Sequence, residues 1–324
     1  MATPDPVRWG ILGTAHIARA SFLPALRAVG GRAYAVAGRE TPCTAAYARD
    51  HGIERAVTGY QALLDDPAVE AVYVALPNSL HAEWAEKALE RRKAVLCEKP
   101  LGLTPVEVAR LITVAGRAQS PLWEAFVFPF RPHFEQIRRW IGDGSIGRLA
   151  VVESTFQFQL SSRDNIRLQP ELGGGALYDV GCYPVHLASL LFRGPAMRAW
   201  AHMDPDPSGV DAEVTGLAEY AHGALRLNAG FVRPYDTFTR IIGSTGSILA
   251  TNPFHPGASD LLVLRAAGEV RIVPAGDGLP SFAAALSHIN QVVRQETSPR
   301  WTAVETASAG AETMGQLRAA AQAH

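Results

Sequence analysis

The chain has 324 residues, of which 48% are hydrophobic, and a formal net charge of −1 at pH 7. This length and hydrophobic content are sufficient for two domains with separate cores. The near-zero charge removes the electrostatic basis for nucleic acid or an anionic membrane as a main partner, so we expect a small-molecule ligand. The sequence has no basic segment followed by an apolar run at its start and no stretch long enough to cross a bilayer, so we expect a cytoplasmic protein.

The cysteines and histidines exclude two further kinds of site. Cys43, Cys97 and Cys182 are odd in number and widely spaced, which favours reduced thiols over a disulfide framework. Cys97 and Cys182 are expected to be small buried packing groups. The ten histidines form no H-E-x-x-H motif and no Cys/His cluster of metal-binding spacing, so no metal site is predicted.

The first part of the chain alternates strands and helices. We expect strands at residues 7–12, 33–37, 69–76 and 94–97, and helices at 17–29, 44–51, 79–91 and 105–118. This alternation predicts an α/β Rossmann domain over residues 1–125, with a doubly wound parallel sheet. Ligands of such sheets bind at the carboxyl ends of the strands.

The remainder, residues 126–324, predicts an α+β domain with an open, mostly antiparallel sheet. Phe156, Phe158 and Leu160 alternate with glutamines, as in a half-buried strand. Strands are expected at residues 148–160, 198–203, 213–221, 224–231, 236–242, 261–265 and 269–273. Terminal helices at 280–295 and from 301 onward are candidates to pack back on the first domain.

A candidate phosphate-binding turn follows the first predicted strand. It is a G-x-A-x-x-A variant of the dinucleotide fingerprint and supplies Gly13, Thr14, Ala15, His16 and Ile17. A plain strand-to-helix turn would look similar.

Gly38 and Arg39 follow the second predicted strand, at the place where an NAD-binding domain carries an acidic residue. An arginine there pairs with a 2′-phosphate, which favours NADP(H). The alternative is a solvated Arg39 with Glu40 on the ribose, which leaves NAD(H) as the second choice.

Two further strand ends supply candidate residues. Pro77, Asn78 and His81 follow one strand and are candidate cofactor contacts, with a helix-capping role as the alternative for His81. Glu98 and Lys99 follow the next strand. The ammonium of Lys99, oriented by Glu98, would polarise a substrate carbonyl or hold a hydroxyl. Both Glu98 and Lys99 are also candidate cofactor contacts. The alternative is an exposed loop lysine.

A polar stripe is expected on a helix over residues 175–192. Asp179, Tyr183 and His186 are spaced to share one helix face. We interpret His186 as a proton donor of near-neutral pKa, Asp179 as the group that orients the imidazole or binds substrate, and Tyr183 as an assisting or replacing donor. The alternative is a structural Asp–His bridge beside a core aromatic residue.

Four motifs, in this order, resemble the Gfo/Idh/MocA oxidoreductases; they lie at residues 13–18, 77–81, 98–102 and 173–186. The chain most resembles the branch of dihydrodiol dehydrogenases, xylose dehydrogenases and anhydrofructose reductases. The resemblance implies NAD(P) in the first domain, substrate in the second, and a homodimer or homotetramer formed through the open sheet. By motif match, Lys99, Asp179 and His186 take the catalytic positions and Tyr183 matches the tyrosine of the dihydrodiol branch.

One segment departs from that branch. Pro129 stands where an arginine is usual and Arg131 where a histidine is usual. Since this segment lies beside the substrate pocket in relatives, the resemblance does not carry the substrate over. The candidate substrate contacts are Lys99, Phe128, Arg167, Asp179 and His186. Arg163, Asn165 and Arg167 have two interpretations, as further substrate contacts or as surface salt-bridge residues.

We therefore expect an NADP(H)-preferring oxidoreductase that interconverts a secondary alcohol and a carbonyl on a sugar, sugar derivative or polyol. One alternative is a ketoreductase of a nucleotide-linked sugar. Another is a non-catalytic dinucleotide-binding sensor, against which the set of Lys99, Asp179 and His186 argues because a sensor needs no proton transfer.

Overall fold

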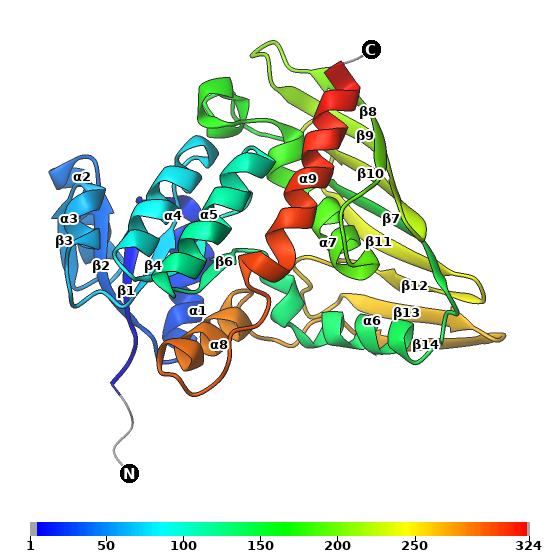
Figure 1. Ribbon diagram of the computed structural model, residues 1–324, viewed down its shortest axis with the longest axis horizontal. Coiled ribbons are helices and arrows are strands. Elements are labelled where there is room, and N and C mark those ends of the chain that lie inside the picture. Colours follow the sequence, from blue (N-terminus) through cyan, green and yellow to red (C-terminus); the bar gives the residue numbers. More distant parts are fainter. Residues whose placement is uncertain (1–4, 323–324) are drawn as a thin grey trace. The chain divides into compact units, whose positions relative to one another are not determined.

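The computed structural model describes residues 5–322 and divides into two compact units (Figure 1). The first unit comprises the chain up to Gly102 together with Val106–Val127 and Leu279–Glu305, and the second comprises Leu103–Pro105, Phe128–Gly278 and the chain from Thr306 onward. Residues 279–305 therefore group with the first unit. The sequence analysis counts them in the second domain and names the terminal helices as candidates to pack back on the first.

The first unit contains a six-stranded parallel sheet of order β3-β2-β1-β4-β5-β6. Its strands are β1 (Arg8–Leu12), β2 (Arg32–Gly38), β3 (Arg55–Thr58), β4 (Ala71–Val74), β5 (Ala94–Cys97) and β6 (Leu122–Glu124). The strand order reverses between β1 and β4, and right-handed crossovers then place the helices of the two halves on opposite faces. The predicted Rossmann sheet is confirmed.

Helices connect these strands. They are the π-helix η1 (Ala18–Phe22), α1 (Leu23–Ala28), α2 (Thr41–Asp50), α3 (Tyr60–Leu64), the 3-10 turn η2 (Asn78–Leu80), α4 (His81–Glu90) and α5 (Pro105–Ala118). Only three elements were not expected from the sequence: β3, α3 and β6. Each has five residues or fewer, too short for a periodic apolar pattern to stand out.

Two side-chain contacts attach α8 (Ala283–Val293) to the first unit. The indole of Trp9, which is fully buried in β1, donates to Oδ1 of Asn290 at 2.9 Å. The guanidinium of Arg294 pairs with Glu70 at 2.7 Å. Phe22 and Tyr73 stack at 4.1 Å between ring centroids in the same core. These contacts explain why a segment late in the sequence belongs to the Rossmann unit.

The second unit contains an eight-stranded sheet of order β14-β13-β12-β11-β7-β10-β9-β8. All neighbours are antiparallel except β7 and β10, so the mostly antiparallel prediction is confirmed. The strands are β7 (Leu149–Gln157), β8 (Arg198–Pro205), β9 (Asp211–Tyr220), β10 (Gly223–Gly230), β11 (Asp236–Gly243), β12 (Gly246–Ala250), β13 (Leu261–Ala266) and β14 (Glu269–Pro274). β12 was not expected, and β7 ends before Phe158 and Leu160.

The helical elements of this unit are η3 (Phe128–Phe130), α6 (Pro132–Gly142), η4 (Ile166–Leu168), η5 (Pro170–Leu172), the π-helix η6 (Leu177–Gly181), α7 (Cys182–Phe192) and α9 (Ala303–Gln322). Figure 1 shows α6, α7 and α9 on the same side of the strands. The opposite face is open: Trp200 and Leu217 are paired across β8 and β9 and are 46% and 36% exposed, and Ile272 of β14 is 59% exposed.

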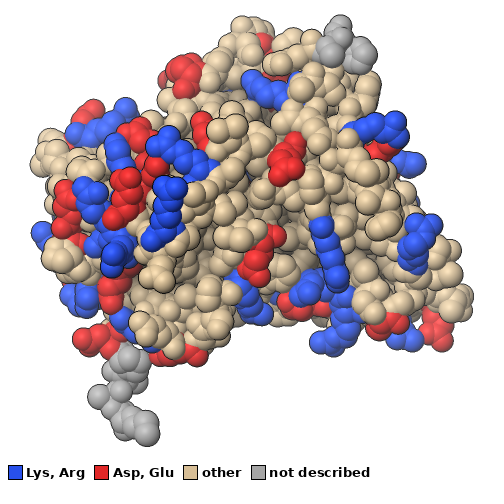
Figure 2. Space-filling view, viewed as in Figure 1, with Lys and Arg blue, Asp and Glu red and all other residues tan. Residues whose placement is uncertain are grey.

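Charges of both signs are interspersed over the face seen in Figure 2, in keeping with the net charge of −1. Within residues 5–322, no helix combines the length and the apolar character that crossing a membrane requires.

Candidate functional site

Gly13 directly follows β1 and has a conformation that favours glycine. Its φ is 95°, and a Cβ at this position would lie 2.5 Å from the carbonyl oxygen of Ala75. Its N–H donates to the carbonyl of Ala37 at 2.9 Å. Residues 14–17 follow with exposed or half-buried side chains and lead into η1. A glycine in close approach, followed by the start of a helix, fits the diphosphate of a dinucleotide.

The end of β2 lies beside this turn. A Cβ on Gly38 would fall 2.1 Å from the Thr44 hydroxyl, so the close packing of α2 requires glycine. The hydroxyl of Tyr47, from α2, donates to the carbonyl of Ala15 at 3.1 Å and ties that helix to the turn. Arg39 is exposed at this strand end. Its predicted contact with a 2′-phosphate is a proposal developed below.

His81 occupies the start of α4 and is only 1% exposed. Its Nδ1 lies 2.7 Å from the carbonyl oxygen of Pro100 and its Nε2 lies 2.8 Å from that of Leu76. Burial lowers its pKa. Any contact of His81 with a cofactor therefore cannot come from a ring nitrogen, because both nitrogens face backbone carbonyls. Pro77 and Asn78, the other candidates in this segment, are half-buried.

Lys99 and Glu98 follow β5 at the carboxyl edge of the sheet. Both are half-buried, so Lys99 is not the exposed loop lysine of the alternative interpretation. The Tyr73 hydroxyl donates a hydrogen bond to Oε1 of Glu98. The Lys99–Pro100 peptide bond is cis.

Glu124, at the end of β6, is a polar residue of this edge that the sequence analysis missed. It is 7% exposed, and its Oε1 accepts a hydrogen bond from the N–H of Leu101 at 2.8 Å. Burial raises its pKa to about 7, opposed by the Leu101 hydrogen bond and the positive charge of Lys99. A carboxylate inside the apolar run 122–128 was the signal that could have found it.

The second unit carries the predicted polar stripe. The expected helix is present from Leu177 to Phe192, but its first part, which contains Asp179, is the π-helix η6, whose turns are wider than those of an α-helix. The regular α-helical spacing that led to the stripe prediction therefore does not hold through Asp179. Asp179, Tyr183 and His186 are all buried.

Asp179 has an arginine partner. Nε of Arg167 lies 2.6 Å from its Oδ2, with the carboxylate 12% and the arginine 37% exposed. The neighbouring Arg163 forms a bidentate pair with Asp206 at 2.7 and 2.8 Å and is 69% exposed, as the surface interpretation expects. Asn165 accepts from the Arg167 backbone N–H at 3.0 Å.

His186 is enclosed in the second unit and is 2% exposed. Its ring meets that of Phe128 edge-on at 5.9 Å. Burial lowers the pKa of His186 to about 3. The expected near-neutral pKa is therefore wrong, because the buried ring lacks the water that would stabilise an imidazolium. The ring is neutral at pH 7.

Tyr183 belongs to an aromatic cluster formed by Phe128, Phe156, Tyr183, Phe254 and His255. The ring of Tyr183 lies 5.2 Å from that of Phe156, 5.1 Å from Phe254 and 5.5 Å from His255. Tyr183 is 8% exposed. The cluster fixes the position of the phenol ring.

The unusual segment at 129–131 has a structural role in the second unit. Arg131 is 3% exposed and forms a salt bridge with Asp277, with 3.2 Å between Nε and Oδ2. The neighbouring His133 bonds the carbonyl of Pro253 through Nε2 at 2.8 Å. Buried arginines need such a partner, which accounts for the Arg131 side chain being turned to Asp277.

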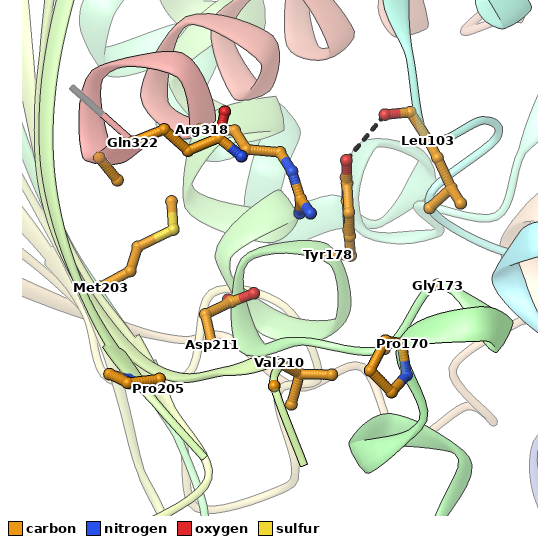
Figure 3. Close-up of a pocket in the computed structure, with 13 residues that line it drawn as sticks. Leu103, Pro170, Gly173, Tyr178, Met203, Pro205, Val210, Asp211, Arg318 and Gln322 are labelled. Atoms are coloured by element: carbon orange, nitrogen blue, oxygen red, sulfur yellow. Dashed lines mark hydrogen bonds between the residues drawn. The ribbon is translucent and has the colours of Figure 1, made fainter. Parts of the chain in front are cut away.

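A cavity of about 300 Å³ lies in the second unit, beside the glycine segment that precedes η6 (Figure 3). The Tyr178 hydroxyl donates to the Leu103 carbonyl at 2.8 Å, and the Arg318 guanidinium lies 5.1 Å from the centroid of the Tyr178 ring. Asp211 accepts from the Leu177 N–H at 2.6 Å. A Cβ on Gly175, whose φ is 119°, would lie 2.2 Å from the Asp211 carboxylate. These groups hold the start of η6 and so position Asp179.

No group of three or more His, Cys, Asp or Glu residues suited to a metal ion is found within residues 5–322.

Comparison with family models covers both units. Residues 7–126 match the model described as the oxidoreductase family with an NAD-binding Rossmann fold, and residues 134–249 match the GFO/IDH/MocA C-terminal domain.

Three similar proteins illustrate the match. The chain is 37% identical over 268 residues to D-xylose 1-dehydrogenase (NADP(+)) 2 of Haloferax volcanii, covering 82% of each chain. It is 38% identical over 264 residues to dTDP-3,4-didehydro-2,6-dideoxy-alpha-D-glucose 3-reductase of Saccharopolyspora spinosa, covering 80% of this chain and 79% of that one. A 3-ketoreductase of Actinomadura kijaniata, solved with NADP and TDP-benzene, superimposes with a TM-score of 0.87 at 29% identity over 97% of both chains.

Proposed function

The chain belongs to the Gfo/Idh/MocA family of oxidoreductases, and from this premise we propose that it is an NADP(H)-preferring enzyme that interconverts a secondary alcohol and a carbonyl on a sugar-like substrate. The observation that carries the proposal is the similarity, over most of the chain, to enzymes whose names specify NADP and a sugar. The glycine turn at Gly13 supports it, because its geometry suits a dinucleotide.

The cofactor would be held by the two strand ends of the Rossmann sheet. Gly13 and the exposed turn that follows it would bind the diphosphate. Gly38 and Arg39 would bind the adenosine ribose, with the planar guanidinium paired to the 2′-phosphate. A bound nicotinamide dinucleotide accepts or supplies the hydride.

Lys99 would act on the substrate oxygen. Its ammonium polarises a carbonyl during reduction and stabilises the developing alkoxide during oxidation. Glu98, held by the Tyr73 hydroxyl, would orient the lysine.

We assign proton transfer to Tyr183 and a neutral hydrogen-bonding role to His186. The low pKa of His186 argues against a positively charged imidazole at neutral pH. Tyr183, which the aromatic cluster holds in place, has the hydroxyl that a donor needs. Asp179, paired with Arg167, would bind substrate hydroxyls.

The substrate class has two candidates. A free sugar or polyol is favoured by the similarity to the xylose dehydrogenase, and a nucleotide-linked keto sugar by the similarity to the dTDP-sugar 3-reductases. We further propose a homodimer or homotetramer through the open sheet face, since Trp200 and Ile272 expose apolar surface there. None of the three cysteines takes part in a disulfide, which suits a reducing compartment such as the cytoplasm.

The test is a turnover assay with purified protein. NADP⁺ and NAD⁺ are offered with aldoses, polyols and glycosides, and NADPH with dTDP-linked keto sugars, and the nicotinamide absorbance is followed. Turnover that Lys99→Ala abolishes supports the proposal and selects the substrate class. Binding of NADP⁺ without turnover on any substrate would favour a sensor.

A further inference from the structure

Two buried side chains hold opposite sides of one peptide group beside Lys99. The carbonyl of Pro100 and the N–H of Leu101 belong to the same peptide group. Nδ1 of His81 lies 2.7 Å from that carbonyl oxygen, and Oε1 of Glu124 lies 2.8 Å from that nitrogen. Both polar atoms of the peptide thus have a side-chain partner, and these partners come from the first residue of α4 and the last residue of β6.

We propose that Glu124 and His81 are positioning residues for Lys99, acting through the Pro100–Leu101 peptide. The proposal rests on the proposed function, because it assumes that Lys99 acts on the substrate.

The burial of these groups argues for a fixed geometry. His81 is 1%, Glu124 7% and Leu101 1% exposed, so water does not compete effectively for their hydrogen bonds. A buried carboxylate is costly where packing alone is needed, since an apolar residue of the same volume would serve. Its presence at the end of β6 points to a role for its oxygen atoms, one of which accepts the Leu101 N–H.

The second ring nitrogen of His81, Nε2, lies 2.8 Å from the carbonyl oxygen of Leu76, which follows β4. A neutral imidazole has one N–H and donates to only one of the two carbonyls, and in this proposal Nδ1 carries that proton and donates to Pro100. Glu124 joins the same segment, which follows β5, to β6. Lys99 directly precedes the Pro100–Leu101 peptide group, so loss of either partner lets the backbone at Lys99 shift. Displacement of a catalytic group by about 1 Å lowers rates on the order of 100-fold.

The test combines hydrogen exchange with kinetics. Glu124→Met keeps the side-chain volume but removes the acceptor, whereas Glu124→Gln keeps an oxygen at the same position. Glu90→Ala removes an exposed carboxylate at the end of α4 and is the control. We expect Glu124→Met to accelerate deuterium uptake in the peptide covering residues 98–103 and to lower kcat by about 10- to 100-fold, with little change in the Kd of NADP⁺. Glu124→Gln should restore slow exchange and most of kcat.

A second variant keeps the proposal testable if Glu124→Met does not fold. His81→Phe removes the contact with Pro100 from the other side and should accelerate exchange in the same peptide. Unchanged deuterium exchange in both folded variants would show that His81 and Glu124 do not hold the Pro100–Leu101 peptide group. Faster exchange with an unchanged kcat would show that this peptide group does not position Lys99.

Failure of the proposed function has a different signature. If Lys99→Ala retains full turnover, Lys99 is not the catalytic group, whatever the exchange data show. If Lys99→Ala is inactive while Glu124→Met matches the parent protein, only the positioning proposal fails.

Discussion

Arg167 and Asp179 form an ion pair in the second unit, with 2.6 Å between Nε and Oδ2, although they lie on separate elements, η4 and η6. Both are predicted substrate contacts, and the pair sets the orientation in which the Asp179 carboxylate is presented. The Arg167 side chain is 37% and the Asp179 side chain 12% exposed, so water screens this pair less than a fully exposed one.

We therefore expect Arg167→Met to raise the KM of the sugar-like substrate and lower kcat/KM by about 10-fold or more, because Asp179 loses its charged hydrogen bond. Arg163→Met removes the pair with Asp206, in which the arginine is 69% exposed, and should stay within about twofold of the parent protein. The measurement is the KM and kcat/KM of both variants in steady-state kinetics. Equal effects would show that the Asp179 pair has no special role.

Arg39→Ala is expected to weaken NADPH binding by about 10- to 100-fold and to leave NADH binding nearly unchanged, because only the 2′-phosphate loses its partner. Arg49→Ala, also on the surface of this unit near the end of α2, is the control. Dissociation constants are measured by nicotinamide fluorescence. A parallel loss of affinity for both dinucleotides would exclude a specific 2′-phosphate contact.

The proton donor is tested with Tyr183→Phe and His186→Asn. We expect Tyr183→Phe to lower kcat by about 100-fold or more, because the phenol oxygen is lost while the ring packing stays. His186→Asn keeps a hydrogen-bonding group and should retain more activity, since the neutral imidazole does not act as an acid at pH 7. The reverse order of effects would identify His186 as the donor. Circular dichroism checks the fold of each variant.

Gly175→Ala should destabilise the protein by about 2 to 4 kcal/mol, because the added Cβ would collide with the Asp211 carboxylate at a φ of 119°. Gly116→Ala is a matched control inside α5, where nothing lies within 4 Å of the added atom. It should stabilise the helix by up to about 1 kcal/mol. Urea unfolding measures both free energies, and equal effects would contradict the close approach.

The stability of the protein should fall as the pH drops below about 6.5. Burial lowers the pKa of His133 to about 4, so between pH 6.5 and 4 the unfolded state binds a proton that the folded state does not. Between pH 6.5 and 4.5, the free energy of unfolding of His133→Gln, measured with urea, should fall by about 2 kcal/mol less than that of the parent protein. His222 is exposed, so His222→Gln is the control. Its free energy of unfolding should change with pH as that of the parent protein does. An unchanged slope in His133→Gln would show that His133 titrates normally.

Glu124 contributes to the pH dependence with the opposite sign. Its pKa is raised from 4.5 to about 7 by folding, so between these pH values the folded protein binds a proton that the unfolded chain does not. The stabilisation that this proton gives is lost as the pH rises through 7. Glu124→Gln should therefore flatten the stability profile between pH 5 and 8 while leaving its acid side unchanged.

The sequence alone determined the Rossmann unit and the open sheet, because both depend on local patterns. Continuous apolar runs such as β5 (Ala94–Cys97) and the alternation along β9 arise from burial on two faces or one, and they are visible in any short window. The turn at Gly13 and the polar ends of β4 and β5 followed from the same patterns, since parallel strands end at one edge of the sheet.

Only the tertiary structure decided how the candidate residues are held. His81 and Glu124 lie far apart in the sequence but hold one peptide group, and no local pattern specifies such a contact. The low pKa of His186 comes from burial by residues distant in the chain, such as Phe128, and the π-helical turn at Asp179 interrupts the periodicity on which the stripe prediction relied. Hydration and packing depend on the complete fold, so the electrostatic character of these groups could not be derived from the order of residues alone.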